Sequence, residues 1–203
     1  MKLVNGWHVP DIDECCLPAI LSELPDLAES YKFINNFRTV IQAGGNVGVY
    51  PKTMALQFDR VITVEPDPVN YSALLLNVAD IKNIEHSQAA FGDKEGTAAI
   101  DHIYPENIGA HQLKAGNDIK VITIDSLDVH DCDFLQLDIE GSEHQAILGA
   151  ERTIKKTYPI ITLELKGLGN RYGYSNEDTI ELLASWGYEI VGRVNRDVIF
   201  ARY

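Results

Sequence analysis

Short runs of apolar residues alternate with longer segments of helical period from about Thr39 to the end of the chain. Apolar runs of this length, each followed by turn residues, are typical of buried strands, and the segments between them are typical of amphipathic helices. This alternation favours an α/β fold with a mostly parallel sheet. The predicted strands span residues 39–43, 61–65, 84–89, 133–138 and 160–165.

Helices are predicted between these strands and near the C-terminus. They cover residues 49–58, a segment opened by 66–68, residues 142–156 and residues 176–186. Pro51 must sit in the first turn of its helix, because a proline further inside would remove a hydrogen bond and clash with the preceding turn. Two apolar runs, 187–191 and 198–201, flank turn residues and predict an antiparallel hairpin that closes the sheet.

Three segments fall outside this alternation. The first 38 residues have helical patterning broken by prolines, and we expect a helical cap or lid over one domain that spans residues 39–203. Residues 101–119 and 167–174 are predicted to be long irregular loops. Long loops in a compact domain are often functional, and ligands of open α/β sheets bind beyond the carboxyl ends of the strands. The substrate pocket is therefore expected where these segments meet that edge.

The charge of the chain narrows the range of its partners. The chain has 203 residues, with 17 Lys and Arg against 30 Asp and Glu, a formal net charge of −13. This charge repels phosphate backbones, so nucleic acid is not expected as a partner. No segment is apolar enough for a signal peptide or a membrane span, so we expect a cytoplasmic protein without a membrane partner. The cysteines and histidines lack the spacing of disulfide frameworks or metal sites, and no metal site is predicted.

A glycine-rich turn, Gly-Gly-Asn-Val-Gly at residues 44–48, joins the first predicted strand to the helix that follows. Glycine permits unusual backbone angles and lets a ligand approach the main chain closely. Glu65 ends the second predicted strand, where a carboxylate can accept hydrogen bonds from the ribose hydroxyls of an adenosine ligand. The turn and the acid together predict an adenosine cofactor site.

The spacing of the glycines separates two adenosine cofactors. A dinucleotide site requires G-x-G-x-x-G, so that the pyrophosphate can approach the start of the helix. Counted from Gly44, this chain has Asn46 and Val49 where glycines are required, and counting from Gly45 also fails. S-adenosylmethionine carries no phosphate and needs only room for its amino-acid tail and donors for its carboxylate. The spacing therefore favours S-adenosylmethionine over NAD.

Several segments, in order and with matching spacing, resemble the FkbM-type methyltransferases. They are Ile-Gln-Ala-Gly-Gly-Asn-Val-Gly at 41–48, Glu-Pro-Asp-Pro-Val-Asn at 65–70 followed by 74–77, 89–97, 124–127, and Leu-Asp-Ile-Glu-Gly-Ser-Glu at 137–143 followed by 148–150 and 159–164. The resemblance covers roughly residues 39–165. Two positions depart from it: Gln42 replaces the usual acid of the first motif, and Gln136 stands where the family often has lysine.

The resemblance implies a Rossmann-like class I methyltransferase fold. This is a three-layer αβα sandwich with a mostly parallel seven-stranded sheet and an antiparallel last strand. It also implies S-adenosylmethionine as the cofactor, and we expect the methyl acceptor to be a hydroxyl group of a small molecule or sugar. Cofactor contacts are expected from Gln42, Gly44, Gly45, Asn46, Val47, Gly48, Glu65, Pro66, Ala89, Ala90 and Asp138.

Asp138 is also the predicted catalytic residue, because in this architecture its strand end faces the transferring methyl group. It would take the proton of the acceptor, directly or through a metal ion that it holds. Asn107, His111 and Arg171 are predicted to bind the acceptor. Two alternatives remain: a non-catalytic S-adenosylmethionine-binding module, which the two glutamines leave open, and a nucleotide-dependent oxidoreductase, which the glycine spacing disfavours. The oligomeric state is not predicted.

Overall fold

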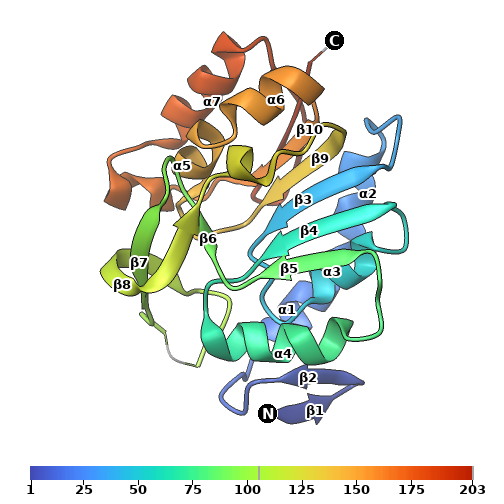
Figure 1. Cartoon of the computed structure of the whole chain (residues 1–203), viewed down its shortest axis with the longest axis vertical. Coiled ribbons are helices and arrows are strands. Elements are labelled where there is room, and N and C mark those ends of the chain that lie inside the picture. Colours follow the sequence, from blue (N-terminus) through green and yellow to red (C-terminus); the bar gives the residue numbers. More distant parts are fainter. Residues whose placement is uncertain (105, 203) are drawn as a thin grey trace.

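A central seven-stranded sheet organises the computed structural model, which describes residues 1–104 and 106–202. Its order is β11-β12-β10-β9-β3-β4-β5 (Figure 1). The strands are β3 (Thr39–Ala43), β4 (Arg60–Val64), β5 (Ile84–Ser87), β9 (Cys132–Leu137), β10 (Ile160–Glu164), β11 (Glu189–Val194) and β12 (Asp197–Ala201). The α/β class and the five predicted parallel strands are confirmed. β12 runs antiparallel to both β10 and β11. The consecutive strands β11 and β12 form the predicted hairpin at the end of the chain.

The register of the parallel strands brings their carboxyl ends to one edge. Ala43, at the end of β3, pairs with Val64 of β4 on one side and with Leu137 of β9 on the other. Leu137 in turn pairs with Leu163 of β10. The turns that follow β3, β4, β9 and β10 are therefore neighbours in space although they are far apart in the sequence.

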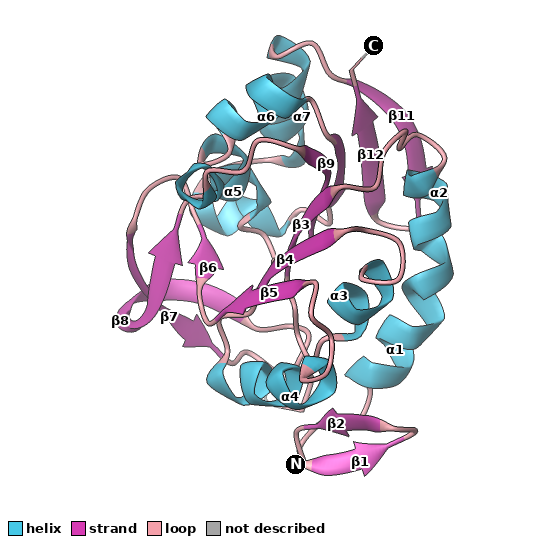
Figure 2. Ribbon diagram, turned by 45° about the vertical axis from the view of Figure 1, so that its right-hand side comes forward, coloured by secondary structure: helices cyan, strands magenta, loops and turns pink. Residues whose placement is uncertain are grey.

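Helices pack against both faces of the sheet (Figures 1 and 2). They are α1 (Cys16–Glu23), α2 (Leu27–Tyr31), α3 (Val49–Met54), α4 (Pro68–Val78), α5 (Glu143–Leu148), α6 (Glu151–Thr157) and α7 (Asn176–Ser185). Alternate strand residues feed two cores: Ile41 of β3 lies in the cluster with α5, α6 and α7, whereas Val40 lies in the cluster with α2, α3 and α4. Because both faces are covered, the strands read as continuous apolar runs.

The single helix predicted over 142–156 is wrong, since α5 and α6 are separate helices. The carbonyl of Gly149 accepts a hydrogen bond from Asp125 N at 2.8 Å, outside the helix. The Asp125 carboxylate then accepts hydrogen bonds from the backbone N–H groups of Arg152 and Thr153, at 2.9 and 2.8 Å. Asp125, which is distant in the sequence, thus caps the N-terminus of α6, so α6 begins as a separate helix.

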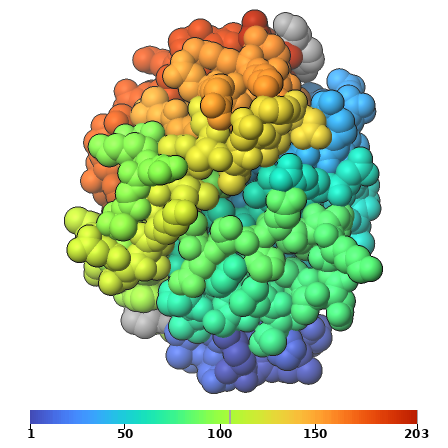
Figure 3. Space-filling model, viewed as in Figure 1, coloured from blue at the N-terminus to red at the C-terminus, as the bar shows by residue number. Residues whose placement is uncertain are grey.

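The N-terminal segment is only partly helical. A hairpin of β1 (Lys2–Val4) and β2 (Trp7–Val9) precedes α1, a 3₁₀ turn (Leu24–Asp26) and α2. The hairpin turns at Asn5 and Gly6, both at positive φ, a pairing typical of two-residue hairpin loops. Two hydrogen bonds of 2.8 Å join the backbone of His8 to the side chain of Asn77. This hairpin therefore rests on α4, at the bottom of the surface in Figure 3.

The long loop predicted over 101–119 is wrong over its second part, residues 112–119, and at Asp101, which belong to strands. β7 (Gly96–Asp101) and β8 (Gln112–Ile122) pair antiparallel, and β8 also pairs with the short β6 (Ala90–Phe91). Many residues of β8 are exposed, so its sequence lacks the apolar run that marks a buried strand. Only residues 102–111 connect the strands. The predicted loop 167–174 contains a 3₁₀ helix, Leu168–Tyr172.

None of the helices in the described part of the chain is long and apolar enough to cross a membrane.

Candidate functional site

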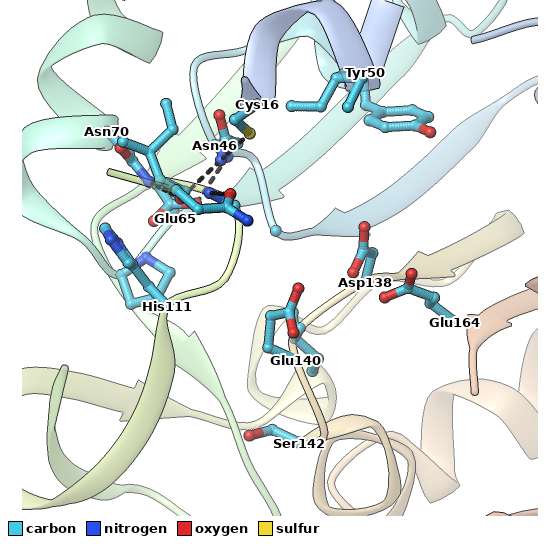
Figure 4. A pocket seen from close by; sticks show the side chains of 18 of the residues that line it. Cys16, Asn46, Tyr50, Glu65, Asn70, His111, Asp138, Glu140, Ser142 and Glu164 are labelled. Atoms are coloured by element: carbon cyan, nitrogen blue, oxygen red, sulfur yellow. Dashed lines mark hydrogen bonds between the residues drawn. The ribbon is translucent and has the colours of Figure 1, made fainter. Parts of the chain in front are cut away.

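A cavity of about 270 Å³ opens at the carboxyl edge of the sheet. Its walls come from the turns after β3, β4, β9 and β10, from α1, and from residues 102–111 (Figure 4). The polar side chains in its wall form two groups in Figure 4, one around Glu65 and one around Asp138. The lining includes Cys16, Glu23, Gly44, Asn46, Tyr50, Glu65, Pro66, Asn70, Ala90, Asn107, Ile108, His111, Asp138, Glu140, Glu164, Lys166 and Arg196.

The glycine turn after β3 forms one wall and needs its glycines for two reasons. Gly44 and Gly48 have φ of +82° and +94°, in the left-handed region that favours glycine. In addition, a Cβ on Gly44 would lie 2.0 Å from the carbonyl oxygen of Asp138. Asp138 N donates to Ala43 O at 3.2 Å, and Gly45 N donates to Val64 O at 3.0 Å. The turn is therefore held between the ends of β9 and β4.

Glu65 is buried behind this turn, with 5% of its surface exposed. Its two carboxylate oxygens accept hydrogen bonds from the backbone N–H groups of Asn46, at 2.7 Å, and Asp67, at 2.8 Å. Burial raises the pKa of Glu65 to about 7, and the two backbone hydrogen bonds oppose this rise. Each oxygen keeps a further lone pair, so the carboxylate can accept hydroxyl protons of a ligand in the cavity.

The connection 102–111 closes over the same wall. Ile108 is buried, and its carbonyl accepts hydrogen bonds from the side-chain amides of Asn46, at 3.1 Å, and Asn70, at 2.8 Å. Asn107 accepts a hydrogen bond from Gly109 N at 3.1 Å, which shapes the turn. The Oδ1 atom of Asn70 is buried and has no partner among the described residues. Asn70 therefore holds the connection through its amide nitrogen, and its Oδ1 lies beneath the cavity surface.

A second group joins three carboxylates and a lysine at the ends of β9 and β10. Single carboxylate oxygens of Asp138, Glu140 and Glu164 lie within 4.8 Å of one another. Lys166 Nζ lies 2.8 Å from Glu140 Oε1 and 2.5 Å from Glu164 Oε2. Glu140 adopts φ of +55°, an uncommon conformation for this residue type.

The charges of this second group set its protonation. Burial, together with the charge of Glu164 and a hydrogen bond to it, raises the pKa of Asp138 well above its usual range. Burial also disfavours ionised Glu164, but the hydrogen bond from Asp138 and the charge of Lys166 outweigh it and lower the pKa of Glu164. Asp138 therefore holds the proton that the pair shares, and Glu164 is the carboxylate free to accept another.

Eight of the predicted site residues line the cavity. These are Gly44, Asn46, Glu65, Pro66, Ala90, Asn107, His111 and Asp138. The others lie behind its wall or away from it: Gly45, Val47, Gly48 and Ala89 are buried in the turns, and Gln42 is buried in the sheet. Arg171 is exposed on the 3₁₀ helix, with its guanidinium 5.7 Å from the ring of Tyr172. The cations at the cavity are Lys166 and Arg196 instead.

The two glutamines that depart from the family pattern are neighbours. Gln42 pairs in register with Gln136, and both are buried. Gln42 Oε1 accepts a hydrogen bond from Thr63 Oγ1 at 2.5 Å, while its Nε2 donates to the carbonyls of Ala43, at 3.1 Å, and Gly44, at 3.0 Å. Gln42 thus supports the glycine turn from within the sheet, and cofactor contact by its side chain stays a prediction.

Sequence reasoning missed the cavity residues that come from α1 and from the end of β10. Cys16 and Glu23 face the cavity from α1, but nothing in an isolated helical segment indicates where it docks. Glu164 and Lys166 had a usable signal, because they follow a buried apolar run that pairs with the strand ending at Asp138. Polar residues at adjacent strand ends meet at one edge.

Comparisons with known proteins agree with this architecture. The profile of the methyltransferase FkbM domain matches residues 42–190. A methyltransferase FkbM from Methylobacillus flagellatus KT is similar in structure, with 22% identity and a TM-score of 0.56 over 83% of this chain and 44% of that one. A putative RNA methyltransferase from Pyrococcus horikoshii has 16% identity and a TM-score of 0.53 over 99% and 94%. The N-methyltransferase NodS from Bradyrhizobium japonicum WM9, in complex with S-adenosyl-L-homocysteine, has 11% identity and a TM-score of 0.52 over 91% and 84%.

The structural likenesses, at these identities, show a shared fold, and the profile match shows the family. No curated protein matches the chain. The chain spans 44% of the length of the FkbM structure, so it corresponds to part of that protein. The profile match covers most of the chain, including the glycine turn, Glu65 and Asp138. The chain therefore belongs to the FkbM methyltransferase family.

Proposed function

We propose that the chain binds S-adenosylmethionine in the cavity and transfers its methyl group to a hydroxyl oxygen of a small molecule or sugar. The observation that carries this proposal is the meeting, in one cavity, of the glycine turn, the buried Glu65 carboxylate and the Asp138–Glu164 pair. The similar fold of an N-methyltransferase in complex with S-adenosyl-L-homocysteine supports the choice of cofactor. The net charge of −13 favours a small acceptor over a nucleic acid.

The wall around Glu65 fits the adenosine part of the cofactor. A ribose carries two hydroxyl donors, and Glu65 offers lone pairs beyond those that its backbone donors use. Pro66 and Ala90 provide apolar surface for the adenine, with Ala89 behind them. Gly44 brings the backbone close to the amino-acid tail, with Gly45, Val47 and Gly48 supporting the turn.

The Asp138–Glu164 pair fits the acceptor end. S-adenosylmethionine supplies an electrophilic methyl group on a sulfonium. Glu164, the ionised member of the pair, would accept the hydroxyl proton of the acceptor as its oxygen forms the new bond, and Asp138 would hold Glu164 through the shared proton. Residues 1–38 would act as the lid, because α1 lines the cavity and would exclude water from the reaction.

A second candidate is a cofactor-binding module without transferase activity. One observation favours it: Lys166 contacts both Glu140 and Glu164, where an acceptor hydroxyl would have to compete for the carboxylates. In such a module the cofactor would bind as in the main proposal, while no acceptor would be methylated.

Transfer of a radiolabelled methyl group separates these candidates. The full chain would be incubated with labelled S-adenosylmethionine and a panel of sugar and small-molecule hydroxyl acceptors, as wild type and as Glu164→Gln and Asp138→Asn. We expect transfer by the wild type, a kcat lower by about 10²- to 10⁴-fold in Glu164→Gln, and unchanged affinity for S-adenosyl-L-homocysteine. Glu85→Gln, an exposed carboxylate paired with Arg60, is the matched control and should retain its kcat.

Two outcomes would contradict the proposal. Binding of S-adenosyl-L-homocysteine with no methyl transfer to any acceptor would favour the cofactor-binding module without transferase activity. Full activity of both the Glu164→Gln and the Asp138→Asn variants would exclude the pair as the proton acceptor.

A further inference from the structure

We propose that Asp67, His102 and His111 form a binding site for a divalent transition-metal ion such as Zn²⁺. One possible ligand atom from each residue lies within 4.8 Å of the other two. His102 Nε2 is 2.8 Å, and His111 Nδ1 is 3.2 Å, from the same oxygen, Oδ2 of Asp67. The two imidazole rings meet edge to face, with centroids 4.4 Å apart. Separations of this size suit ligands that share one ion at metal–ligand distances of about 2.0–2.2 Å.

His111 supplies independent evidence that a ligand is required. Its side chain is only 8% exposed, yet within the described residues 1–104 and 106–202 its Nε2 has no hydrogen-bond partner and its Nδ1 meets only Asp67 Oδ2, at 3.2 Å and without hydrogen-bond geometry. Leaving a buried polar atom without a partner costs about 1–3 kcal/mol, so such atoms are rare unless something else satisfies them. An ion bound at Nδ1 would give this buried nitrogen a partner with the geometry that Asp67 alone does not supply.

Asp67 is held so that one oxygen remains available. Its Oδ1 caps α4 by accepting hydrogen bonds from Val69 N, at 2.8 Å, and Asn70 N, at 3.0 Å. This capping fixes the carboxylate plane and directs Oδ2 towards the two histidines. An oriented carboxylate and two imidazoles form a ligand set that suits zinc, iron and related ions.

The other cluster of possible ligands, Asp138 with Glu140 and Glu164, is less suited to an ion. Lys166 already pairs with Glu140 and Glu164 there and supplies the compensating charge. No lysine or arginine is paired with Asp67 among the ion pairs of the described residues. Its partners are two imidazoles, which can bind a metal ion in their neutral form. The histidine cluster is therefore the better metal site.

The position of the cluster links it to the cofactor wall. Asp67 N donates to Glu65 Oε1 at 2.8 Å, so the metal carboxylate and the ribose carboxylate belong to residues two positions apart in one turn. His102 and His111 lie at the two ends of the connection 102–111, whose Ile108 carbonyl is bonded to Asn46 and Asn70. A bound ion would fix this connection over the cavity. It would thereby increase the affinity for an adenosine ligand without taking part in the chemistry.

Zinc titration of the chelator-treated full chain tests the site without any assay of activity. Calorimetry with Zn²⁺ alone should show one ion per chain, and Co²⁺ should give the visible d–d absorption of a low-coordinate histidine site. His102→Ala and His111→Ala should each weaken Zn²⁺ binding by at least about tenfold. Asp67→Asn keeps a residue that can cap α4 and should also weaken binding. His130→Ala is the matched control, because His130 is an exposed histidine 3.7 Å from the carboxylate of Asp128.

The outcomes separate a built site from adventitious binding. No Zn²⁺ binding by the wild type would overturn the proposal, as would equal weakening by His130→Ala. Unchanged Zn²⁺ affinity and Co²⁺ absorption in the histidine and Asp67→Asn variants would overturn it as well. Circular dichroism would confirm that each variant folds. If a histidine variant does not fold, Asp67→Asn, whose cap is retained, decides the result.

Discussion

At the scale of single residues, the environment of Glu65 is the most informative feature of the site. A carboxyl group with 5% exposure is costly unless its charge is satisfied, and among the described residues only two backbone N–H groups satisfy that of Glu65. The raised pKa, about 7, shows that this compensation is incomplete. Further donors from a ligand would complete it. The residue is thus prepared to bind a diol and is unfavourably placed without one.

The affinity for S-adenosyl-L-homocysteine should depend on pH through Glu65. Only the ionised carboxylate accepts from both ribose hydroxyls, and its ionised fraction rises as the pH passes the pKa of about 7. The affinity should therefore reach a plateau above this pH and fall by up to about tenfold for each unit below it. Calorimetry at several pH values would measure this. Glu65→Gln should bind weakly with little dependence on pH, and an identical pH profile in wild type and variant would refute the ribose role.

Gln42 and Gln136 show how far a sequence can be interpreted residue by residue. Taken singly, each glutamine replaces a charged residue that is common in the family. Together they left open that the chain binds the cofactor without catalysing methyl transfer. In the fold they are register partners in the middle of the sheet, flanked by Thr63 and Thr162, so they form one polar row. The sequence could not show this, because the pairing joins strands separated by most of the domain.

At the scale of elements, the turn after β3 is fixed by its neighbours as much as by its own residues. Gly44 has φ of +82° and lies against the carbonyl oxygen of Asp138, at the end of β9. The close approach of these two strand ends brings the cofactor turn and the candidate proton acceptor into one cavity. A side chain at position 44 would force them apart.

Gly44→Ala should therefore destabilise the fold. The added Cβ would lie 2.0 Å from Asp138 O, at a φ that alanine rarely adopts, and we expect a loss of about 1–3 kcal/mol in the free energy of unfolding. Gly96→Ala is the control, because nothing lies within 4 Å of its added Cβ. Urea unfolding of both variants measures the difference. Equal stabilities of the two variants would show that the turn can relax at no cost.

The strands whose ends sequence reasoning placed best are those buried on both faces. β3, β4, β9 and β10 were predicted to within a residue at most ends, because parallel strands in a covered sheet are uniformly apolar. β8 escaped because much of it is exposed, and α5 and α6 were joined because the cap from Asp125 is distant in the chain. The sequence of β8 thus carries no apolar run that would mark a strand, and the break between α5 and α6 depends on a residue far away in the chain. The hairpin at Asn5 and Gly6 did carry a local signal that the helical interpretation overlooked.

At the scale of the whole molecule, the cavity exists only because three distant segments meet. The sheet edge supplies Glu65 and Asp138, α1 supplies Cys16, and the connection between β7 and β8 supplies His111. The predicted cofactor residues of the sheet edge could be found from motifs, since adjacent strand ends always meet there. The acceptor side could not, because the docking of α1 and of the β7–β8 connection depends on tertiary contacts. For this reason Arg171 was predicted at the site, whereas Lys166 and Arg196 line it.

Calorimetric titration of the full chain with S-adenosyl-L-homocysteine, and separately with NAD, tests the central claim most directly. The account predicts one molecule of S-adenosyl-L-homocysteine bound per chain, no measurable binding of NAD, and a large loss of affinity in Glu65→Ala. Absence of S-adenosyl-L-homocysteine binding, or equal affinity in wild type and Glu65→Ala, would contradict it.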